Sequence, residues 1–307
     1  MNKIKRILKT LGLCLAISIF ASGCVNQHPE GVDNKDDYGD IKNPKVVATS
    51  MSTLHILSKL GADVVGVPKS SLEKIPDKYK NATVIGLPMA PDIEKIKELN
   101  PDWVFSPVSL SSDLQPKYAN AKFRYGFLNL NNVDGMYKSI LDLGRILGKE
   151  KEANKLYEEY KTYIEDYKKK HKHLKKPKVL ILMGLPGSYV VATDNSYVGS
   201  LVKMAGGDNV YTSKTEQFIN VNTEDMLKKN PDIILRTAHA MPKDVMKMFR
   251  DEFKTNDIWS NFRAVKEDKV YDLDYKKFGM SAKFNYPSAL NDLDKILYKN
   301  GGNDGRK

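Results

Sequence analysis

Cysteine is nearly absent from this chain, which contains only Cys14 and Cys24 among its 307 residues. Both belong to an N-terminal leader and its cleavage site, described below, so we expect no free thiol and no disulfide in the mature chain. Thiol catalysis and cysteine-ligated metal sites are thereby excluded. The motifs Gly-x-Ser-x-Gly, His-Glu-x-x-His and Cys-x-x-Cys are missing too, and no group of His, Asp and Glu gathers near the candidate ligand loops. We therefore expect that this protein is not an enzyme.

A nucleic-acid-binding pattern is also missing. The formal net charge is +11, but the basic residues are spread along the chain and are densest from Lys168 to Lys176, without interleaved stacking aromatics. A nucleic-acid-binding module would concentrate basic and stacking residues on one face. We expect no nucleic-acid partner and attribute the charge to attraction towards an anionic envelope surface.

The N-terminus has the organisation of a leader that is removed. A basic start precedes an apolar stretch from Leu11 to Phe20, which is too short for a comfortable membrane span. Ala21-Ser22-Gly23-Cys24 resembles a bacterial lipobox, which implies a signal peptide over 1–23 and a diacylglycerol on the sulfur of Cys24. Residues 24–44 would be a flexible, lipid-anchored tether at the extracellular face of the cytoplasmic membrane. The alternative is a secretory signal in which Cys24 is incidental.

Two parts of the chain repeat in the same order. Ile93 to Phe105 and Thr223 to Leu235 each contain an amphipathic helix with an acidic start, then Asn-Pro-Asp, then an apolar run suited to a buried strand. Val47 to Leu54 and Val191 to Val198 each contain a strand end, a polar cap and a helix start. With 41% hydrophobic residues, the chain is large enough for two cores. The repeat predicts two similar α/β lobes, each with a short parallel sheet.

A long amphipathic helix separates the two repeats. Residues 149–175 contain no Gly or Pro, and their apolar residues recur at three- and four-residue steps. We predict a single backbone helix joining the lobes, with a ligand between the lobes at the carboxyl ends of the strands. The predicted division is an N-terminal lobe over 45–148, the linking helix over 149–175, a C-terminal lobe over 176–299 and a polar tail over 300–307.

Three positions are candidates for binding a ligand. The backbone N–H groups around Ser50 to Thr53 form a candidate anion site at a helix start, although most helix caps bind nothing. Met89 lies in a loop stiffened by two prolines, and His239 follows a predicted strand. One His with one Met makes a poor zinc site but a good pair of axial ligands for a haem iron, because the porphyrin supplies the other four bonds.

Several motifs resemble those of one family. The similarity runs from about Lys45 to Lys299. The motifs that carry it are Gly86-Leu87-Pro88-Met89, Leu180 to Tyr189, His239-Ala240-Met241-Pro242 and Asn256-Asp257-Ile258-Trp259. They resemble the IsdE-like haem-binding lipoproteins of the iron-regulated surface determinant system of Gram-positive surfaces. The broader resemblance is to helical-backbone substrate-binding proteins of ABC importers.

The resemblance implies a ligand and its contacts. It implies that haem b is bound as a transported ligand between axial ligands Met89 and His239. It places contacts to the haem propionates and edge at Met51, Ser52, Ser70 and Ser71.

The resemblance also implies partners and a place. These are an ABC permease that receives haem for iron acquisition, cell-wall haem donors, and the membrane through a lipid anchor, with the protein itself a monomer. Glu94 and Glu224, equivalent in the repeat, would dock the permease; the alternative is that they only complement the helix dipoles.

Other functions remain open from the sequence. A ferric-siderophore or cobalamin-binding lipoprotein on the same scaffold is the nearest, and it would require arginines or aromatics around the ligand rather than a Met/His pair. An enzyme on a two-lobed α/β scaffold would require an acid, base or nucleophile cluster. A passive adhesin would not require a repeated architecture.

Overall fold

The computed structural model describes residues 41–299, which all belong to one compact unit of the chain. The predicted signal peptide, Cys24, most of the predicted tether and the polar tail lie outside the described residues. Between residues 41 and 299, no helix is long and apolar enough to cross a membrane.

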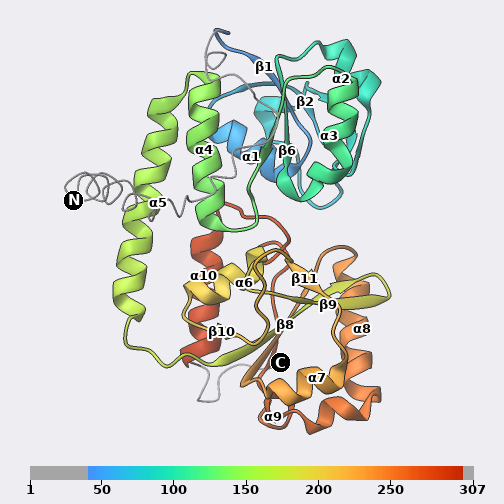
Figure 1. Ribbon diagram of the computed structural model, residues 1–307, viewed down its shortest axis with the longest axis vertical. Helices are drawn as coiled ribbons and strands as arrows, with labels where there is room; N and C mark the ends of the chain where they lie inside the picture. Colours follow the sequence, from blue (N-terminus) through green and yellow to red (C-terminus); the bar gives the residue numbers. More distant parts are fainter. Residues whose placement is uncertain (1–40, 300–307) are drawn as a thin grey trace, which may run out of the picture. The chain divides into compact units, whose positions relative to one another are not determined.

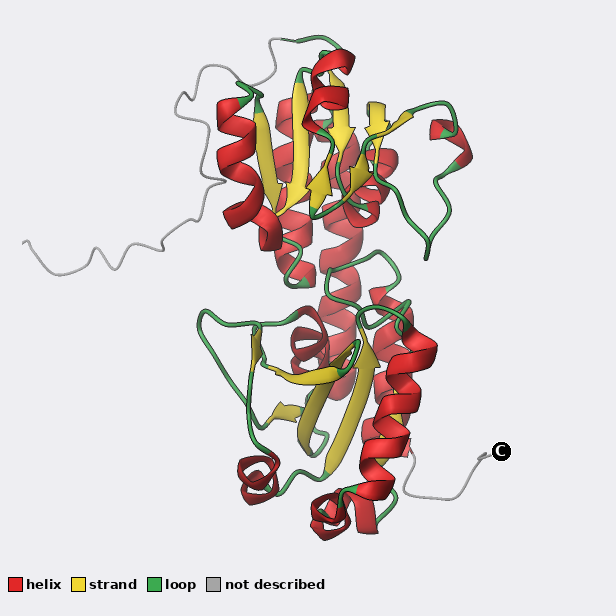
Figure 2. Ribbon diagram, turned by 90° about the vertical axis from the view of Figure 1, so that its right-hand side faces the viewer, coloured by secondary structure: helices red, strands yellow, loops and turns green. Residues whose placement is uncertain are grey.

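The first lobe contains a five-stranded sheet in the order β3-β2-β1-β6-β7, in which every pairing is parallel. Helices flank this sheet (Figures 1 and 2). The strands are β1 (Lys45–Ala48), β2 (Asp63–Val67), β3 (Thr83–Val84), β6 (Trp103–Pro107) and β7 (Tyr125–Leu128). The helices are α1 (Met51–Lys59), α2 (Ile93–Leu99), α3 (Ser111–Asn120) and α4 (Val133–Leu147), with short turns η1 (Asp77–Tyr79) and η2 (Val108–Leu110). A separate hairpin consists of β4 (Gly86–Leu87) and β5 (Ala90–Pro91).

The second lobe contains a sheet in the order β11-β9-β8-β12-β13, with β10 also pairing with β8. The strands are β8 (Lys178–Leu185), β9 (Ser188–Ala192), β10 (Asp208–Asn209), β11 (Phe218–Ile219), β12 (Ile233–Ala238) and β13 (Val270–Asp272). The helices are α6 (Tyr197–Met204), α7 (Thr223–Lys229), α8 (Pro242–Thr255), α9 (Arg263–Lys266) and α10 (Tyr286–Asp294), with turns η3 (Asp257–Asn261) and η4 (Lys295–Lys299). The two-lobed α/β architecture predicted from the repeat is therefore present.

The repeated Asn-Pro-Asp motif performs the same task in both lobes. Its asparagine adopts the left-handed conformation that ends α2 and α7, and its proline prevents either helix from continuing. Its aspartate then accepts a hydrogen bond from the first N–H group of the neighbouring strand. Asp102 Oδ2 lies 2.7 Å from the nitrogen of Lys45, and Asp232 Oδ2 lies 2.7 Å from the nitrogen of Lys178. The motif thus sets the register of β6 against β1 in the first lobe and of β12 against β8 in the second.

By this register, β1 of the first lobe corresponds to β8 of the second. The sequence comparison of Val47 to Leu54 with Val191 to Val198 had predicted a different correspondence. That match aligned β1 with β9, yet β9 runs antiparallel to β8 and pairs with a second antiparallel strand, β11. The second sheet therefore adds an antiparallel pair to a parallel β8-β12-β13 core. The match is explained by the caps, because α1 and α6 both begin at a serine that accepts a hydrogen bond from the backbone three residues later.

The helix α5 (Glu150–His171) links the lobes and follows α4 after a two-residue turn (Figure 1). Its 22 residues make it about 33 Å long. Gly144 of α4 allows the close contact between the two helices, since a Cβ added there would lie 2.5 Å from that of Ala153. At its other end, Tyr167 donates a 2.5 Å hydrogen bond to Asp294 of α10, and Nε2 of His171 lies 2.9 Å from the same carboxylate. The linking helix is thus fixed to both lobes.

The hydrophobic core follows the alternation of the strands. One large core contains residues from both lobes and from α4, α5 and α10, including Val46 of β1 and Ile233 of β12. Their neighbours Val47 and Ile234 point to the other faces of the two sheets and belong to separate, smaller cores. Each sheet is therefore buried on both faces, as parallel sheets usually are.

Candidate functional site

Large apolar side chains are seldom exposed in the described part of the chain, and their positions are informative. The exposed ones are Leu72, Val84, Leu87, Met89, Leu174 and Met241. Leu87 and Met89 belong to the β4–β5 hairpin, and Met241 belongs to the loop that contains His239. Single exposed apolar residues need no explanation, but their concentration on ligand loops predicted from the sequence does.

Met89 is displayed at the tip of the β4–β5 hairpin. It forms the two-residue turn with Pro88, and 65% of its surface is exposed. The hairpin is fixed at its base because the carbonyl of Gly86 accepts a 2.7 Å hydrogen bond from Lys69, and Gly86 itself has a φ of 100°, which favours glycine. A rigid turn therefore presents the thioether to its surroundings, as the two prolines predicted.

His239 is the first residue after β12. Its backbone N–H donates a 3.0 Å hydrogen bond to the carbonyl of Gly184 in β8, which extends the pairing of β8 with β12 by one residue. The residue as a whole is exposed. Neighbouring residues of the chain nevertheless shield part of the imidazole ring from water, and this burial lowers the pKa of His239 below its ordinary value of 6.5. At neutral pH the imidazole is uncharged and keeps a lone pair for a metal.

Gly184 brings α8 close to the strand that holds His239. A Cβ added at Gly184 would lie 2.2 Å from Cγ1 of Val245 and 2.7 Å from Cε2 of Phe249, both on α8. The absence of a side chain therefore allows α8 to pack directly on β8. Because the loop from His239 to Met241 connects β12 with α8, this close packing restricts the position of the loop. Nothing in the sequence marked this glycine for that role.

Met51 and Ser52 lie in the first turn of α1. The side chain of Met51 is 8% exposed and belongs to the large hydrophobic core, whereas Ser52 is half-buried. The contact expected at Met51 must therefore come from its backbone, since the first N–H groups of a helix have no partner within the helix. Ser50 caps α1 by accepting a 3.1 Å hydrogen bond from Thr53. The other backbone N–H groups of this turn are available to the anion that the sequence predicts at this position.

Ser70 and Ser71 lie in the loop after β2, which is connected to α1. Ser70 Oγ accepts hydrogen bonds from the backbone of Leu72 and Glu73, so its oxygen already stabilises a turn, while Ser71 is exposed. Glu73 in turn lies 3.0 Å from Nε2 of His55, one helical turn after Met51. The structure thus ties the two groups of predicted edge contacts to each other.

A contact from the second lobe reaches the same glutamate. Lys283 Nζ donates a 2.7 Å hydrogen bond to Oε1 of Glu73, and the neighbouring Ala282 N–H donates to the carbonyl of Leu130. The two partners of the ion pair are 210 residues apart in sequence, so sequence reasoning had no signal for it. Hydrogen bonding by His55, followed by that of Lys283, lowers the pKa of Glu73 to about 2.

Glu94 and Glu224 occupy equivalent positions, as the repeat predicted. Each lies in the first turn of its helix, α2 or α7, and each is exposed. Glu94 forms a 2.9 Å ion pair with Lys97, but its side chain remains 75% exposed. An exposed pair of this kind contributes little to stability, so the carboxylate is available to a partner.

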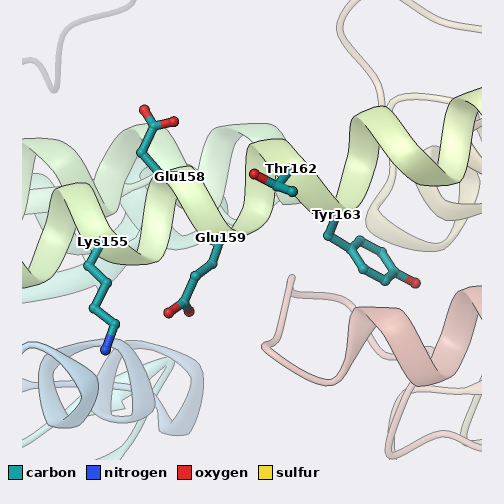
Figure 3. A pocket seen from close by; sticks show the side chains of 5 residues that line it. All are labelled: Lys155, Glu158, Glu159, Thr162 and Tyr163. Atoms are coloured by element: carbon teal, nitrogen blue, oxygen red, sulfur yellow. The ribbon is translucent and has the colours of Figure 1, made fainter.

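Other features of the described residues do not compete with these loops. No group of three or more His, Cys, Asp or Glu side chains able to hold a metal ion occurs between residues 41 and 299. Figure 3 shows an open surface hollow on α5, lined by Lys155, Glu158, Glu159, Thr162 and Tyr163. This hollow has no His or Met among its lining residues and lies on a different element from either candidate ligand. The two candidate ligands therefore lie on separate loops, Met89 on the β4–β5 hairpin of the first lobe and His239 after β12 of the second.

Comparison with known proteins gives a family match and close relatives. A model of the periplasmic binding protein family matches residues 46–276. The high-affinity heme uptake system protein IsdE of Staphylococcus aureus (strain Newman) is 39% identical over 295 residues, covering 96% of this chain and 99% of that protein.

Two solved structures are similar along their whole length. An ABC transporter substrate-binding protein from Listeria monocytogenes EGD-e has a TM-score of 0.80 at 45% identity, covering 84% of this chain and 100% of that one. The structure of S. aureus IsdE complexed with heme has a TM-score of 0.78 at 42% identity, covering 83% of this chain and 99% of that one.

Proposed function

This chain belongs to the periplasmic binding protein family, and we propose that it is a high-affinity haem-binding lipoprotein that delivers haem to a membrane ABC permease for iron acquisition. Like its relatives, it is a substrate-binding protein and not an enzyme. Haem is favoured over a siderophore or cobalamin because the relative that covers almost the whole chain is a haem uptake protein, and because a Met/His pair suits haem iron.

One observation carries this proposal. Of the six large apolar side chains exposed in residues 41–299, Leu87 and Met89 lie on the hairpin and Met241 lies on the loop that contains His239. A haem macrocycle presents two wide apolar faces and an iron that takes one ligand on each face. Two loops that combine exposed apolar surface with one iron-binding atom each have the chemistry that such a ligand requires.

The residues present fit the iron. Met89 would supply a thioether and His239 an imidazole nitrogen, a combination that favours haem iron over a bare divalent ion. Burial lowers the pKa of His239, which keeps the ring in the neutral form that binds a metal. Because Gly184 and the β12 pairing hold the backbone of His239, the ring is presented from a rigid element.

The haem edge would meet the α1 start and the loop after β2. We assign the propionates to the backbone N–H groups of Met51 and Ser52, with Ser71 as a hydroxyl donor. Ser70 contributes by shaping this loop, since its oxygen accepts two backbone hydrogen bonds. Carboxylates at a helix N-terminus are stabilised by the helix dipole and by unpaired N–H groups.

The remaining assignments concern partners and place. We propose that Glu94 and Glu224 dock one lobe each on the permease, that cell-wall haem donors supply the ligand, and that the protein acts as a monomer. We further propose a lipid anchor at Cys24, which would hold the protein at the extracellular face of the cytoplasmic membrane. A single acyl chain binds membranes weakly, so the two chains of a diacylglycerol suit a permanent anchor.

Haem spectroscopy of two variants tests the ligand assignment. We expect the wild-type protein mixed with haem to show the spectrum of a six-coordinate iron with one thioether and one imidazole ligand. His239→Ala should shift the Soret band and weaken haem retention by about tenfold or more, because one strong ligand is lost, and Met89→Ala should change the spectrum in a different way.

The control is His173→Ala, which alters an exposed histidine in the polar run after α5. It should leave the spectrum unchanged. A wild-type protein that does not bind haem would refute the proposed function, whereas an unchanged spectrum in His239→Ala would refute only the ligand assignment.

A further inference from the structure

Met241 has an unusual backbone conformation. Its φ is 43° and its ψ is 56°, in the left-handed region where a side chain with a Cβ is disfavoured. Among the described residues, the others with positive φ that are not glycine are Asn43, Asn100, Lys122, Asn230 and Asp268. Asn and Asp tolerate this conformation because their short polar side chains bond locally. Met241 is the one large apolar residue in this set, so its conformation is strained without local compensation.

Met241 also occupies a helix N-cap position, although its side chain cannot accept a hydrogen bond from the backbone. Met241 is the N-cap of α8, and no side chain accepts a hydrogen bond from the first turn of that helix. In α1, α2, α4, α6 and α7 a serine, asparagine or aspartate in this position does accept one, whereas α3, α5, α9 and α10 lack a side-chain cap as α8 does. A polar cap or a glycine would stabilise α8 more than methionine does. A second local preference is therefore violated at this position.

The side chain of Met241 also gains no burial in return. It is 56% exposed, although α8 beneath it buries Val245 and Phe249 in the core of the second lobe. A strained backbone, a missing cap and an exposed thioether thus coincide at one residue, two positions after His239. Residues that break several local rules without compensation within the protein are expected at functional sites.

We infer that Met241 is a haem-contacting residue whose side chain packs on the apolar surface of the porphyrin beside the His239 ligand. This inference rests on the proposed function and adds a third residue to it. The left-handed backbone directs the chain sharply between β12 and α8 and leaves the thioether exposed on the His239 loop. Methionine suits this contact because its long, polarisable side chain adapts to irregular apolar surfaces and packs well against aromatic rings.

Met241 is assigned as a packing residue and not as the sulfur ligand of the iron. Axial ligands bind on opposite faces of the macrocycle. His239 and Met241 are separated by a single residue on one loop, whereas Met89 lies on a rigid turn of the other lobe. The role inferred for Met241 is therefore to shield one face and slow the release of haem.

Replacing Met241 by glycine separates this role from a structural one. Met241→Gly removes the strain at positive φ, so we expect the haem-free protein to unfold at a higher urea concentration than the wild type. The loaded variant should keep the six-coordinate spectrum but transfer its haem to excess apomyoglobin about tenfold faster, because the apolar contact is lost. Met241→Leu should retain slow transfer, since it preserves an apolar side chain of similar size.

Lys122→Gly provides the matched control. Lys122 also has positive φ, at 59°, and is exposed, but it lies between α3 and β7. Its replacement should stabilise the haem-free protein in the same way and leave haem transfer unchanged.

Three results would overturn the inference. Haem transfer from Met241→Gly at the wild-type rate would remove the proposed contact. A lower urea midpoint in that variant would show that the methionine stabilises the fold. Loss of the six-coordinate spectrum would make Met241 an iron ligand. A wild-type protein that binds no haem would instead refute the proposed function, and this inference with it.

Discussion

Glu73 is the residue at which three separate segments meet. Its two carboxylate oxygens contact His55 of α1 and Lys283 of the second lobe, while its backbone N–H donates to Ser70. The partners are half-buried, so water screens these interactions less than it would on an open surface. One carboxylate therefore connects the loop predicted to meet the haem edge with both lobes.

The lowered pKa of Glu73 predicts a pH-dependent contribution to stability. Its pKa falls from the ordinary value of 4.5 to about 2 in the folded protein, so the unfolded chain binds the extra proton first as the pH falls. The stabilisation is fully present above pH 4.5 and is lost between that value and about 2. We expect Glu73→Gln to lower the free energy of unfolding near neutral pH, and the difference from the wild type to shrink on acidification.

Urea unfolding from about pH 7 to about pH 3 measures this difference. Glu165→Gln, at an exposed position on α5, is the control, and it should follow the wild type at every pH. Parallel curves for Glu73→Gln and the wild type over this range would mean that Glu73 carries no stability through its charge.

At the scale of elements, α8 packs closely on β8 because Gly184 has no side chain. Val245 and Phe249 occupy the space where a Cβ of Gly184 would be, and the carbonyl of Gly184 accepts the hydrogen bond from His239. The packing of one helix on one strand thus also determines where the candidate iron ligand begins.

Gly184→Ala should therefore disturb both stability and binding. The added methyl group overpacks the helix–strand contact, for which we expect a loss of about 1–3 kcal/mol in the free energy of unfolding. Haem retention should fall as well, because α8 and the His239 loop must move. Chemical unfolding and haem transfer to apomyoglobin measure the two effects.

Two further variants make this test specific. Adding Val245→Ala should recover part of the lost stability, since it removes the methyl group nearest to the new Cβ. Gly279→Ala is the control, because a Cβ there meets nothing closer than 3.5 Å. If Gly184→Ala were as stable as the wild type, the close packing of α8 on β8 would not be required.

Helices and strands could be predicted from the sequence where caps, glycines or prolines mark their ends. The helix α4 runs from Val133 to Leu147 because Asn132 caps its start and Gly148 ends it in the left-handed conformation, and both signals are visible in the sequence. The linking helix ends at His171, short of the predicted Lys175, as no glycine or proline marks its end before Pro177. The antiparallel pair β9–β11 was missed, since alternation along a strand does not reveal the direction of its neighbours.

The candidate site was predictable only in part. Met89 and His239 could be proposed as ligands because a methionine between prolines and a histidine after a strand are visible in the sequence. The contact of Glu73 with Lys283 and the packing at Gly184 depend on tertiary structure. The burial of the Met51 side chain could not be predicted from the sequence, and it leaves only the backbone of this residue for the expected contact.

At the scale of the whole molecule, the repeat provides two similar helix starts, one in each lobe. Glu94 and Glu224 are exposed in the first turns of α2 and α7. A partner that recognises both would have to bind the two lobes at once, which makes its affinity depend on the product of two weak contacts.

Reversing both charges tests this docking proposal. The double variant Glu94→Lys, Glu224→Lys should bind haem with the wild-type spectrum but fail to support import by the permease in proteoliposomes, because like charges would oppose docking. Glu98→Lys, at an exposed position on α2, is the control and should support import. Wild-type import by the double variant would refute the docking role of the two glutamates.

The placement of the two tryptophans, one in each lobe, has a practical consequence for spectroscopy. The chain contains two tryptophans. Trp103 stacks on Phe105 in the first lobe, and Trp259 stacks on Phe253 in the second, with both indoles almost fully buried. Replacing either one by phenylalanine would leave a single tryptophan in one known half of the protein. Its selectively excited emission would then report unfolding around that indole, and quenching by a bound chromophore could be followed from either side.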